Sequence, residues 1–177
     1  MQAVKQRPGE RERRRWTIRE VVQGKPFGHP THAMLIHFPV AFYLGALAFD
    51  LVSNVGRFPQ APVAATWLIA GALIATVPAA LTGLVDWWGM VPGSTKRRTA
   101  TRHMLFQLAA AATFAGILAT RWGERLRPEA RWTWIALEIL GVAVMSVGQW
   151  LGGVLVYQMG MRVGTAQRHP VPRERSS

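Results

Sequence analysis

Four long apolar segments, separated by short polar stretches, dominate the hydrophobic pattern of this chain of 177 residues. The clearest runs from Phe58 to Val85 without one charged residue, and it exceeds the roughly 20 residues that an α-helix needs to cross a bilayer. The pattern predicts an all-α integral membrane protein whose four transmembrane helices form an antiparallel bundle, because the connections are short. The predicted spans are residues 34–55, 62–86, 102–121 and 132–157.

The polar remainder is too short to form a second folded domain. We expect a basic, flexible N-terminal segment at residues 1–28 that is retained and not cleaved, a membrane domain at 29–161, and a basic tail at 162–177. Cysteine is absent, which excludes disulfides, thiolate metal sites and a cysteine nucleophile.

The net charge of +12 is concentrated beside the apolar segments. Sixteen of the 21 Lys and Arg residues fall in the N-terminal segment, the second connection and the tail, which share one side of a four-span protein. Positive residues are retained in the cytoplasm, so we predict a bacterial inner-membrane protein with both termini inside. The lipid bilayer is then the expected partner of these charges. Nucleic acid is not an expected partner, since the sequence has no motif of a folded nucleic-acid-binding domain.

The histidines gather at one edge of this pattern. His37 lies near the start of the first span and His103 at the start of the third, so the two are predicted at similar depth. A b-type haem needs two axial ligands, an apolar slot and cations for its propionates. We predict His37 and His103 as the axial ligands, with Arg97, Arg98 and Arg102 at the mouth. The alternative is that these histidines only cap helices or reach interfacial water.

A second metal hypothesis uses the histidines that precede the first span. His29 and His32 are three residues apart and can bind zinc or copper together with Asp86, from the end of the second span. Pro30 lies between them, which disfavours helical spacing.

Two acidic residues, Asp50 and Glu138, fall toward the outer ends of their spans, where a charge is costly. Either they form a proton relay, or they are interfacial caps that Arg57 and Arg131 neutralise from nearby in the sequence. The sequence leaves both interpretations open.

Small residues mark where helices approach closely. Gly148 and Gly152 form a small-xxx-small spacing in the last span, which favours packing within the chain or, alternatively, a homodimer through these two glycines. Pro39 and Pro78 each lack a backbone donor inside a span and are expected to bend their helices.

Several segments resemble a known family. They are His29-Pro30-x-His32, Met34 to Ala41, Phe49-Asp50-Leu51, Leu81 to Trp87, His103, and Trp150 to Tyr157. In this order, over residues 28–164, they are similar to a bacterial membrane family catalogued as domain of unknown function 2231. The resemblance implies a four-helix inner-membrane domain, and the joining of some relatives to Rieske-type domains implies redox chemistry. Ala33 stands where proline is usual, and Met159 where a histidine is often found; a Met159 ligand would be its substitute.

We therefore predict a small b-type cytochrome or redox-linked membrane anchor that passes electrons near the cytoplasmic face, with a membrane or redox partner protein. The alternative is a non-catalytic scaffold or assembly protein without a cofactor. A stand-alone enzyme is not expected, since no triad, phosphate loop or paired-carboxylate site has usable spacing.

Overall fold

The computed structural model describes residues 16–56 and 58–162 of the chain. Every regular element in this part is helical. In chain order they are α1 (Ile18–Val22), η1 (Lys25–Phe27), α2 (Thr31–Leu35), α3 (His37–Gly56), α4 (Ala61–Trp88), α5 (Thr95–Arg121), η2 (Trp122–Glu124), α6 (Trp132–Gly153) and η3 (Val154–Gln158). The element η3 is a turn of π-helix, whereas η1 and η2 are 3-10 helices.

Four helical segments are long and apolar enough to cross a membrane: Thr31–Gly56, Ala61–Trp88, Thr95–Glu124 and Trp132–Gln158. Large apolar side chains such as Ile74 and Trp150 are exposed on their outer faces, as expected for a surface that lies against lipid. The predicted four-helix membrane bundle is therefore confirmed. The third segment begins at residue 95 and not 102, because the Ser94 side chain accepts a hydrogen bond from the Arg97 N–H and caps the helix.

The first segment is interrupted close to its start. α2 ends at Leu35 and α3 begins at His37, with Ile36 in a turn between them. Pro39 explains the break, because it has no N–H to donate to the Leu35 carbonyl and its ring crowds that carbonyl. The interruption lies where Pro39 was expected to bend the span, whereas α4 continues as one helix through Pro78. The separate helix α2 packs against α4.

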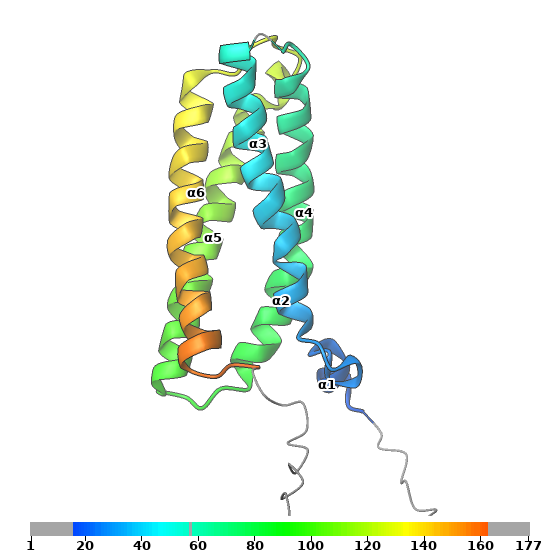
Figure 1. The fold of residues 1–177 in the computed structure, drawn as a ribbon, viewed down its shortest axis with the longest axis vertical. Coiled ribbons are helices and arrows are strands. Elements are labelled where there is room, and N and C mark those ends of the chain that lie inside the picture. Colours follow the sequence, from blue (N-terminus) through cyan, green and yellow to red (C-terminus); the bar gives the residue numbers. More distant parts are fainter. Residues whose placement is uncertain (1–15, 57, 163–177) are drawn as a thin grey trace, which may run out of the picture.

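The long helices are arranged as two hairpins. α3 packs mainly against α4, and α5 packs mainly against α6, while α4 with α5 and α3 with α6 make the lesser contacts between hairpins (Figure 1). Successive helices run in opposite directions, so α3 and α5 run the same way on one diagonal of the bundle. We call the end that holds His32 and His103 the histidine end, and the end that holds Asp50 and Arg121 the arginine end.

Aromatic and small side chains fill the middle of the bundle. The rings of Tyr43 and Phe114 stack with centroids 4.0 Å apart and an interplanar angle of 19°. Gly141 of α6 makes room for them, since a Cβ there would lie 2.8 Å from the Phe114 ring. Gly148 lies against Gln107 of α5, where a Cβ would come within 2.4 Å of the amide nitrogen. The glycine face of α6 therefore packs against other helices of the same chain at Gly141 and Gly148, and the homodimer through Gly148 and Gly152 stays a prediction.

The structure describes residues 16–28 of the segment before the first span. Residues 1–15, which were expected to be flexible, lie outside the described part, but α1 is a capped helix. The Thr17 side chain accepts from the Glu20 N–H, and the Glu20 carboxylate accepts from the Thr17 N–H. That backbone N–H, together with Lys25, lowers the pKa of Glu20 to about 2. The carboxylate that caps α1 is therefore ionised throughout the physiological pH range, and the spacing Thr17-x-x-Glu20 was its sequence signal.

Candidate functional site

His32 is held by the second helix of its own hairpin. Its Nδ1 lies 2.8 Å from the carbonyl oxygen of Ala79 in α4. The ring lies over Gly83, one turn further along, where a Cβ would come within 2.8 Å of the His32 Cε1 atom. The short helix α2 brings the side chain to this position, and the missing side chain of Gly83 provides the space.

His103 is held in the same way by the other hairpin. Its Nδ1 lies 2.7 Å from the carbonyl oxygen of Gly148 in α6. The ring lies over Gly152, where a Cβ would be 3.2 Å from the His103 Cε1 atom. The π-helical turn η3 begins at Val154, directly after this contact, and such turns are frequent at functional sites.

The two half-buried rings face each other between the hairpins. Their centroids are 6.3 Å apart, and the ring planes are nearly perpendicular at 89°. A carbonyl oxygen can only accept, so each Nδ1 carries the proton and each Nε2 keeps its lone pair. Within the described residues neither Nε2 has a hydrogen-bond partner. A backbone carbonyl on the far nitrogen is the arrangement that orients histidine for metal ligation.

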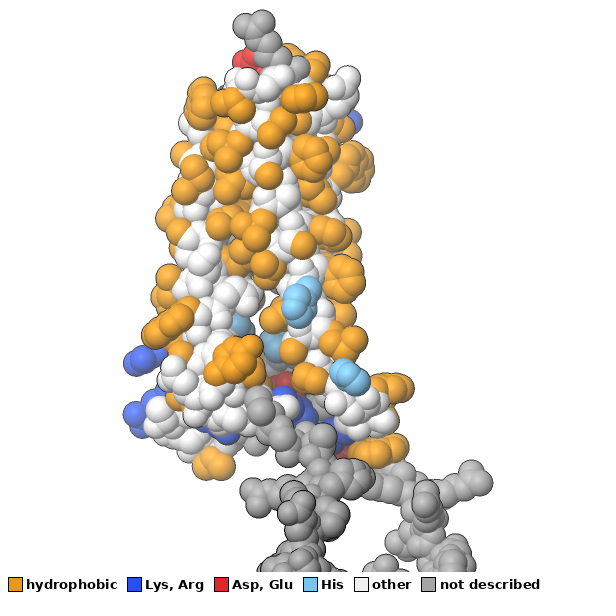
Figure 2. All heavy atoms as spheres, in the orientation of Figure 1, with side chains coloured by type: hydrophobic (Ala, Val, Ile, Leu, Met, Phe, Trp, Pro, Cys, Tyr) orange, Lys and Arg blue, Asp and Glu red, His pale blue; other side chains and the backbone are white. Residues whose placement is uncertain are grey.

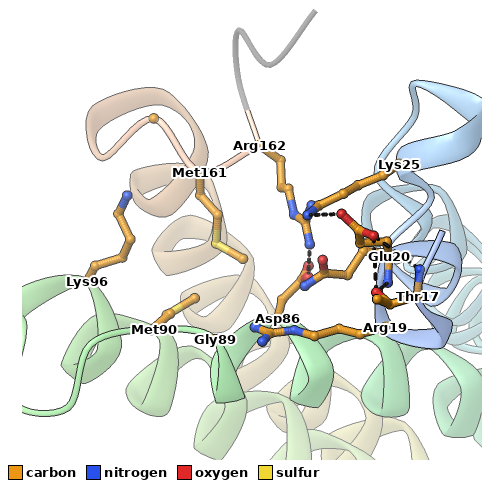
Figure 3. A pocket seen from close by; sticks show the side chains of 12 residues that line it. Thr17, Arg19, Glu20, Lys25, Asp86, Gly89, Met90, Lys96, Met161 and Arg162 are labelled. Carbon is orange, nitrogen blue, oxygen red and sulfur yellow. Dashed lines mark hydrogen bonds and ion pairs between the residues drawn. The ribbon is translucent and has the colours of Figure 1, made fainter. Parts of the chain in front are cut away.

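The space around these rings is open to one face of the bundle. Figure 2 shows that this face is hollowed between the hairpins toward the histidine end, with histidine and acidic side chains visible inside. Beyond it, a cavity of about 580 Å³ lies between the N-terminal segment, the end of α4 and the start of α5 (Figure 3). Asp86 of α4 lines this cavity and forms an ion pair with Arg162.

The structure pairs His103 with His32 and not with the predicted His37. His37 is exposed, and its Nδ1 lies 3.2 Å from the Met34 carbonyl oxygen on its own helical segment. The arginines predicted to hold propionates stay a prediction. Arg97 lies over the Trp87 ring at 4.1 Å, and Arg98 and Arg102 are exposed.

The second predicted metal group is not brought together. His29 is exposed and bonds to the Phe27 carbonyl, His32 bonds to Ala79, and Asp86 is paired with Arg162. Across residues 16–56 and 58–162, no group of three or more His, Asp or Glu side chains is placed to hold a metal ion.

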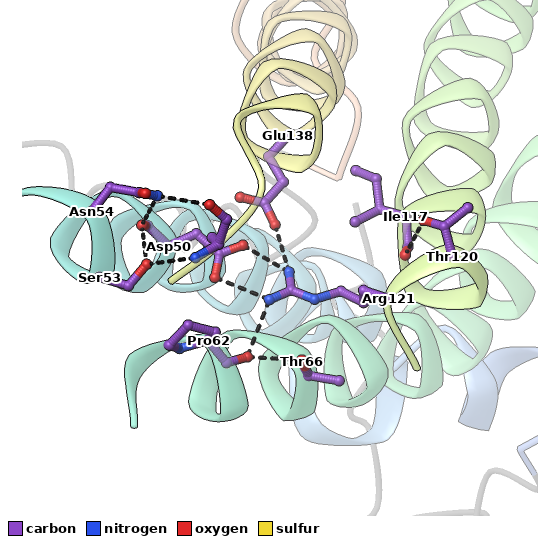
Figure 4. A network of polar contacts seen from close by, with 10 residues as sticks. Asp50, Ser53, Asn54, Pro62, Thr66, Ile117, Thr120, Arg121 and Glu138 are labelled. Carbon is purple, nitrogen blue, oxygen red and sulfur yellow. Dashed lines mark hydrogen bonds and ion pairs between the residues drawn. The ribbon is translucent and has the colours of Figure 1, made fainter. Parts of the chain in front are cut away.

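A second polar cluster lies at the arginine end and joins all four long helices (Figure 4). Arg121 of α5 donates to both carboxylate oxygens of Asp50 in α3, at 2.7 and 3.0 Å. It also donates to Glu138 of α6 at 3.0 Å and to the Pro62 carbonyl of α4 at 3.1 Å. The three charged side chains have no solvent exposure.

This cluster corrects the expectation that Arg57 and Arg131 neutralise the two acids. Arg57 lies outside the described residues, and Arg131 pairs with Glu124 at the surface. Arg121, at the last residue of α5, was counted in the sequence among the basic residues of a connection. Basic residues are common at the ends of membrane spans, so the position of Arg121 in the sequence does not indicate that its side chain points into the bundle.

A constant separation along the chain would have indicated both clusters. His32 and His103, Tyr43 and Phe114, and Asp50 and Arg121 are each 71 residues apart, and each pair is in contact. A constant separation of contacting positions means that α2 and α3 run in register with the parallel helix α5 along the length of the bundle. Three of these six residues, Tyr43, Phe114 and Arg121, were not candidates from the sequence, and His32 was a candidate only for the zinc or copper site with His29 and Asp86.

The fold and this pair of histidines define a four-helix membrane protein built from two helical hairpins, with one histidine of each hairpin at their junction. The chain belongs to the family described as predicted membrane protein (DUF2231), whose model matches residues 28–165. This confirms the resemblance found in the sequence. Neither a curated protein nor a solved structure matches the chain.

Proposed function

We propose that the protein is a small b-type cytochrome of the bacterial inner membrane, which binds haem between its hairpins and exchanges electrons with a partner protein. The observation that carries the proposal is the facing pair of His32 and His103, each with its Nδ1 proton held by a carbonyl oxygen. The two free Nε2 atoms are the ligands, and the carbonyls of Ala79 and Gly148 fix their orientation.

The spacing of the rings supports ligation of one metal by both. A metal to imidazole nitrogen bond is about 2 Å long, and the ring centre lies roughly 1 Å behind the nitrogen. Two rings on opposite sides of one metal therefore have centres about 6 Å apart, and the observed separation is 6.3 Å. Perpendicular ring planes are compatible with axial ligation, since each ring bonds through one atom.

The position between the hairpins supports haem in preference to a bare ion. Within the described residues, no acid or third histidine completes a shell around the two rings, whereas a porphyrin would supply the remaining four nitrogens itself. One face of the bundle is hollowed toward the histidine end, with histidine side chains visible inside the hollow (Figure 2). A bound haem would supply one-electron chemistry at this place.

Charge supports a cytoplasmic location for the histidine end. Sixteen of the 21 basic residues belong to the N-terminal segment, the first turns of α5 and the tail. Two of these regions meet at the histidine end, where Arg19 and Lys96 line one cavity. Under the positive-inside rule this end faces the cytoplasm, and the electron partner is reached from that side.

Visible spectra of the purified protein test the proposal. The full chain is prepared in mild detergent from cells supplied with a haem precursor, and oxidised and dithionite-reduced spectra are recorded. We expect sharp α and Soret bands on reduction, and their loss in His32→Ala and His103→Ala. His37→Ala and His29→Ala are matched controls and should keep the bands, because both side chains are exposed.

Two results would contradict this assignment. A colourless protein that also takes up no added haem would remove the cytochrome function. Loss of the bands in His37→Ala with retention in His32→Ala would restore the pairing expected from the sequence and reject the pairing in the structure.

A further inference from the structure

We infer that the cavity at the histidine end binds a phosphate-bearing anion at the membrane surface. The cavity has a volume of about 580 Å³ and is formed by α1, η1, the end of α4, the start of α5 and the residues after η3 (Figure 3). The inference does not depend on haem, because none of the residues that carry it touches the histidine pair.

The side chains around the cavity carry more positive than negative charge. Four are cationic and two are acidic, and they are Arg19, Lys25, Lys96, Arg162, Glu20 and Asp86. Two of the cations are neutralised, since Lys25 pairs with Glu20 at 3.3 Å and Arg162 pairs with Asp86. Arg19 and Lys96 have no ion pair among the described residues, so two positive charges face the cavity without a counterion.

The end of α4 has a glycine at the point where the Arg19 side chain approaches it. The Arg19 guanidinium lies on Gly89, where a Cβ would come within 1.7 Å of the Nη2 atom. A side chain at this position would displace the guanidinium. The capping box of Thr17 and Glu20 holds α1 in place, and its carboxylate stays ionised because the pKa of Glu20 is lowered to about 2. The helix that carries Arg19 is therefore held by its own cap beside the end of α4.

The chemistry of the two free cations favours a phosphate group. An arginine can donate two parallel hydrogen bonds to phosphate oxygens, and a lysine adds a compact charge. The cavity is larger than a phosphate ion, which leaves room for the group attached to it. The neighbouring segment also borders lipid, since Val21, Val22 and Phe27 line an apolar pocket on its other side. An anionic phospholipid headgroup and a free phosphate are the two sources of such a ligand.

Binding of defined probes to the full chain in detergent tests this inference. Dihexanoyl phosphatidylglycerol, dihexanoyl phosphatidylcholine and inorganic phosphate are titrated by calorimetry at one fixed ionic strength. We expect the phosphatidylglycerol to bind and its affinity to fall about tenfold in Arg19→Gln and in Lys96→Gln. Arg98→Gln and Arg102→Gln remove the same charge from exposed positions outside the cavity and should change the affinity less than twofold.

The probes also identify the source of the ligand. Binding of phosphatidylglycerol without binding of inorganic phosphate assigns a lipid headgroup, and competition between the two assigns the phosphate group itself. Gly89→Ala is a second variant, which keeps every charge but displaces Arg19 and should weaken binding as Arg19→Gln does. Equal binding of phosphatidylcholine, equal losses in cavity and control variants, or no binding would overturn the inference. The same titrations on the His32→Ala protein show that the outcome is separate from haem.

Discussion

Asp50 and Arg121 are joined by two parallel hydrogen bonds inside the bundle, although both side chains lie within helices predicted to span a membrane. They are separated by 71 residues, as are His32 and His103 at the other end. Asp50 and Arg121 form a buried ion pair, whereas His32 and His103 each leave an Nε2 atom without a hydrogen-bond partner among the described residues. The same register between two parallel helical segments thus produces a structural contact at one end and a candidate ligand site at the other.

Replacing Arg121 by methionine should destabilise the protein strongly. The change leaves the carboxyls of Asp50 and Glu138 buried without their cation, and removing one partner of a buried pair costs about 3–5 kcal/mol. The free energy of unfolding in mixed micelles measures the effect. Arg127→Met removes an exposed pair with Glu124 and should cost less than about 1 kcal/mol. Similar losses in both variants would show that the buried cluster does not hold the helices together.

Replacing Phe114 by alanine should also destabilise the bundle, by about 3–5 kcal/mol. The ring is fully buried, stacks on Tyr43 and covers Gly141, so its removal leaves a cavity between three helices. Phe106→Ala on the same helix is the control, because its ring is partly exposed. A double-mutant cycle with Tyr43→Leu should give a coupling energy of about 0.5–1.5 kcal/mol. Additive losses would indicate that the stacked contact is not formed.

Adding a methyl group beneath either histidine should weaken haem binding. In Gly83→Ala the new Cβ would lie 2.8 Å from His32 Cε1, and in Gly152→Ala it would lie 3.2 Å from His103 Cε1. The first ring must move further, so Gly83→Ala should show the greater loss of reduced Soret absorbance. Gly116→Ala is the matched control and should leave the spectrum unchanged, since a Cβ at that position meets no atom within 4 Å. Unchanged spectra in both site variants would count against the rings as ligands.

Single cysteines can test the orientation, because the chain has no cysteine of its own. Glu129→Cys lies in the exposed connection at the arginine end, and Val91→Cys lies in the exposed connection at the histidine end. In intact spheroplasts a membrane-impermeant maleimide should label Glu129→Cys and leave Val91→Cys unlabelled until the membrane is opened. The reverse pattern would place the histidine end outside.

The sequence by itself determined the four membrane spans, the break before Pro39 and the close packing of the glycine face in α6. These features follow from local causes. The length and apolarity of each segment set the spans, the missing N–H of proline sets the break, and the missing Cβ of glycine permits a neighbouring backbone.

The tertiary structure alone decided which side chains meet. His32 and His37 are five residues apart, and on a helix such positions point about 140° away from each other; only the packing of α2 on α4 shows that His32 faces His103. Arg121 likewise turns inward to Asp50 and Glu138, whereas Arg131, nearer to Glu138 in the sequence, remains at the surface. The physical reason is that contacts between helices depend on how each helix is rotated about its axis. That rotation is fixed by the packing of all four helices together.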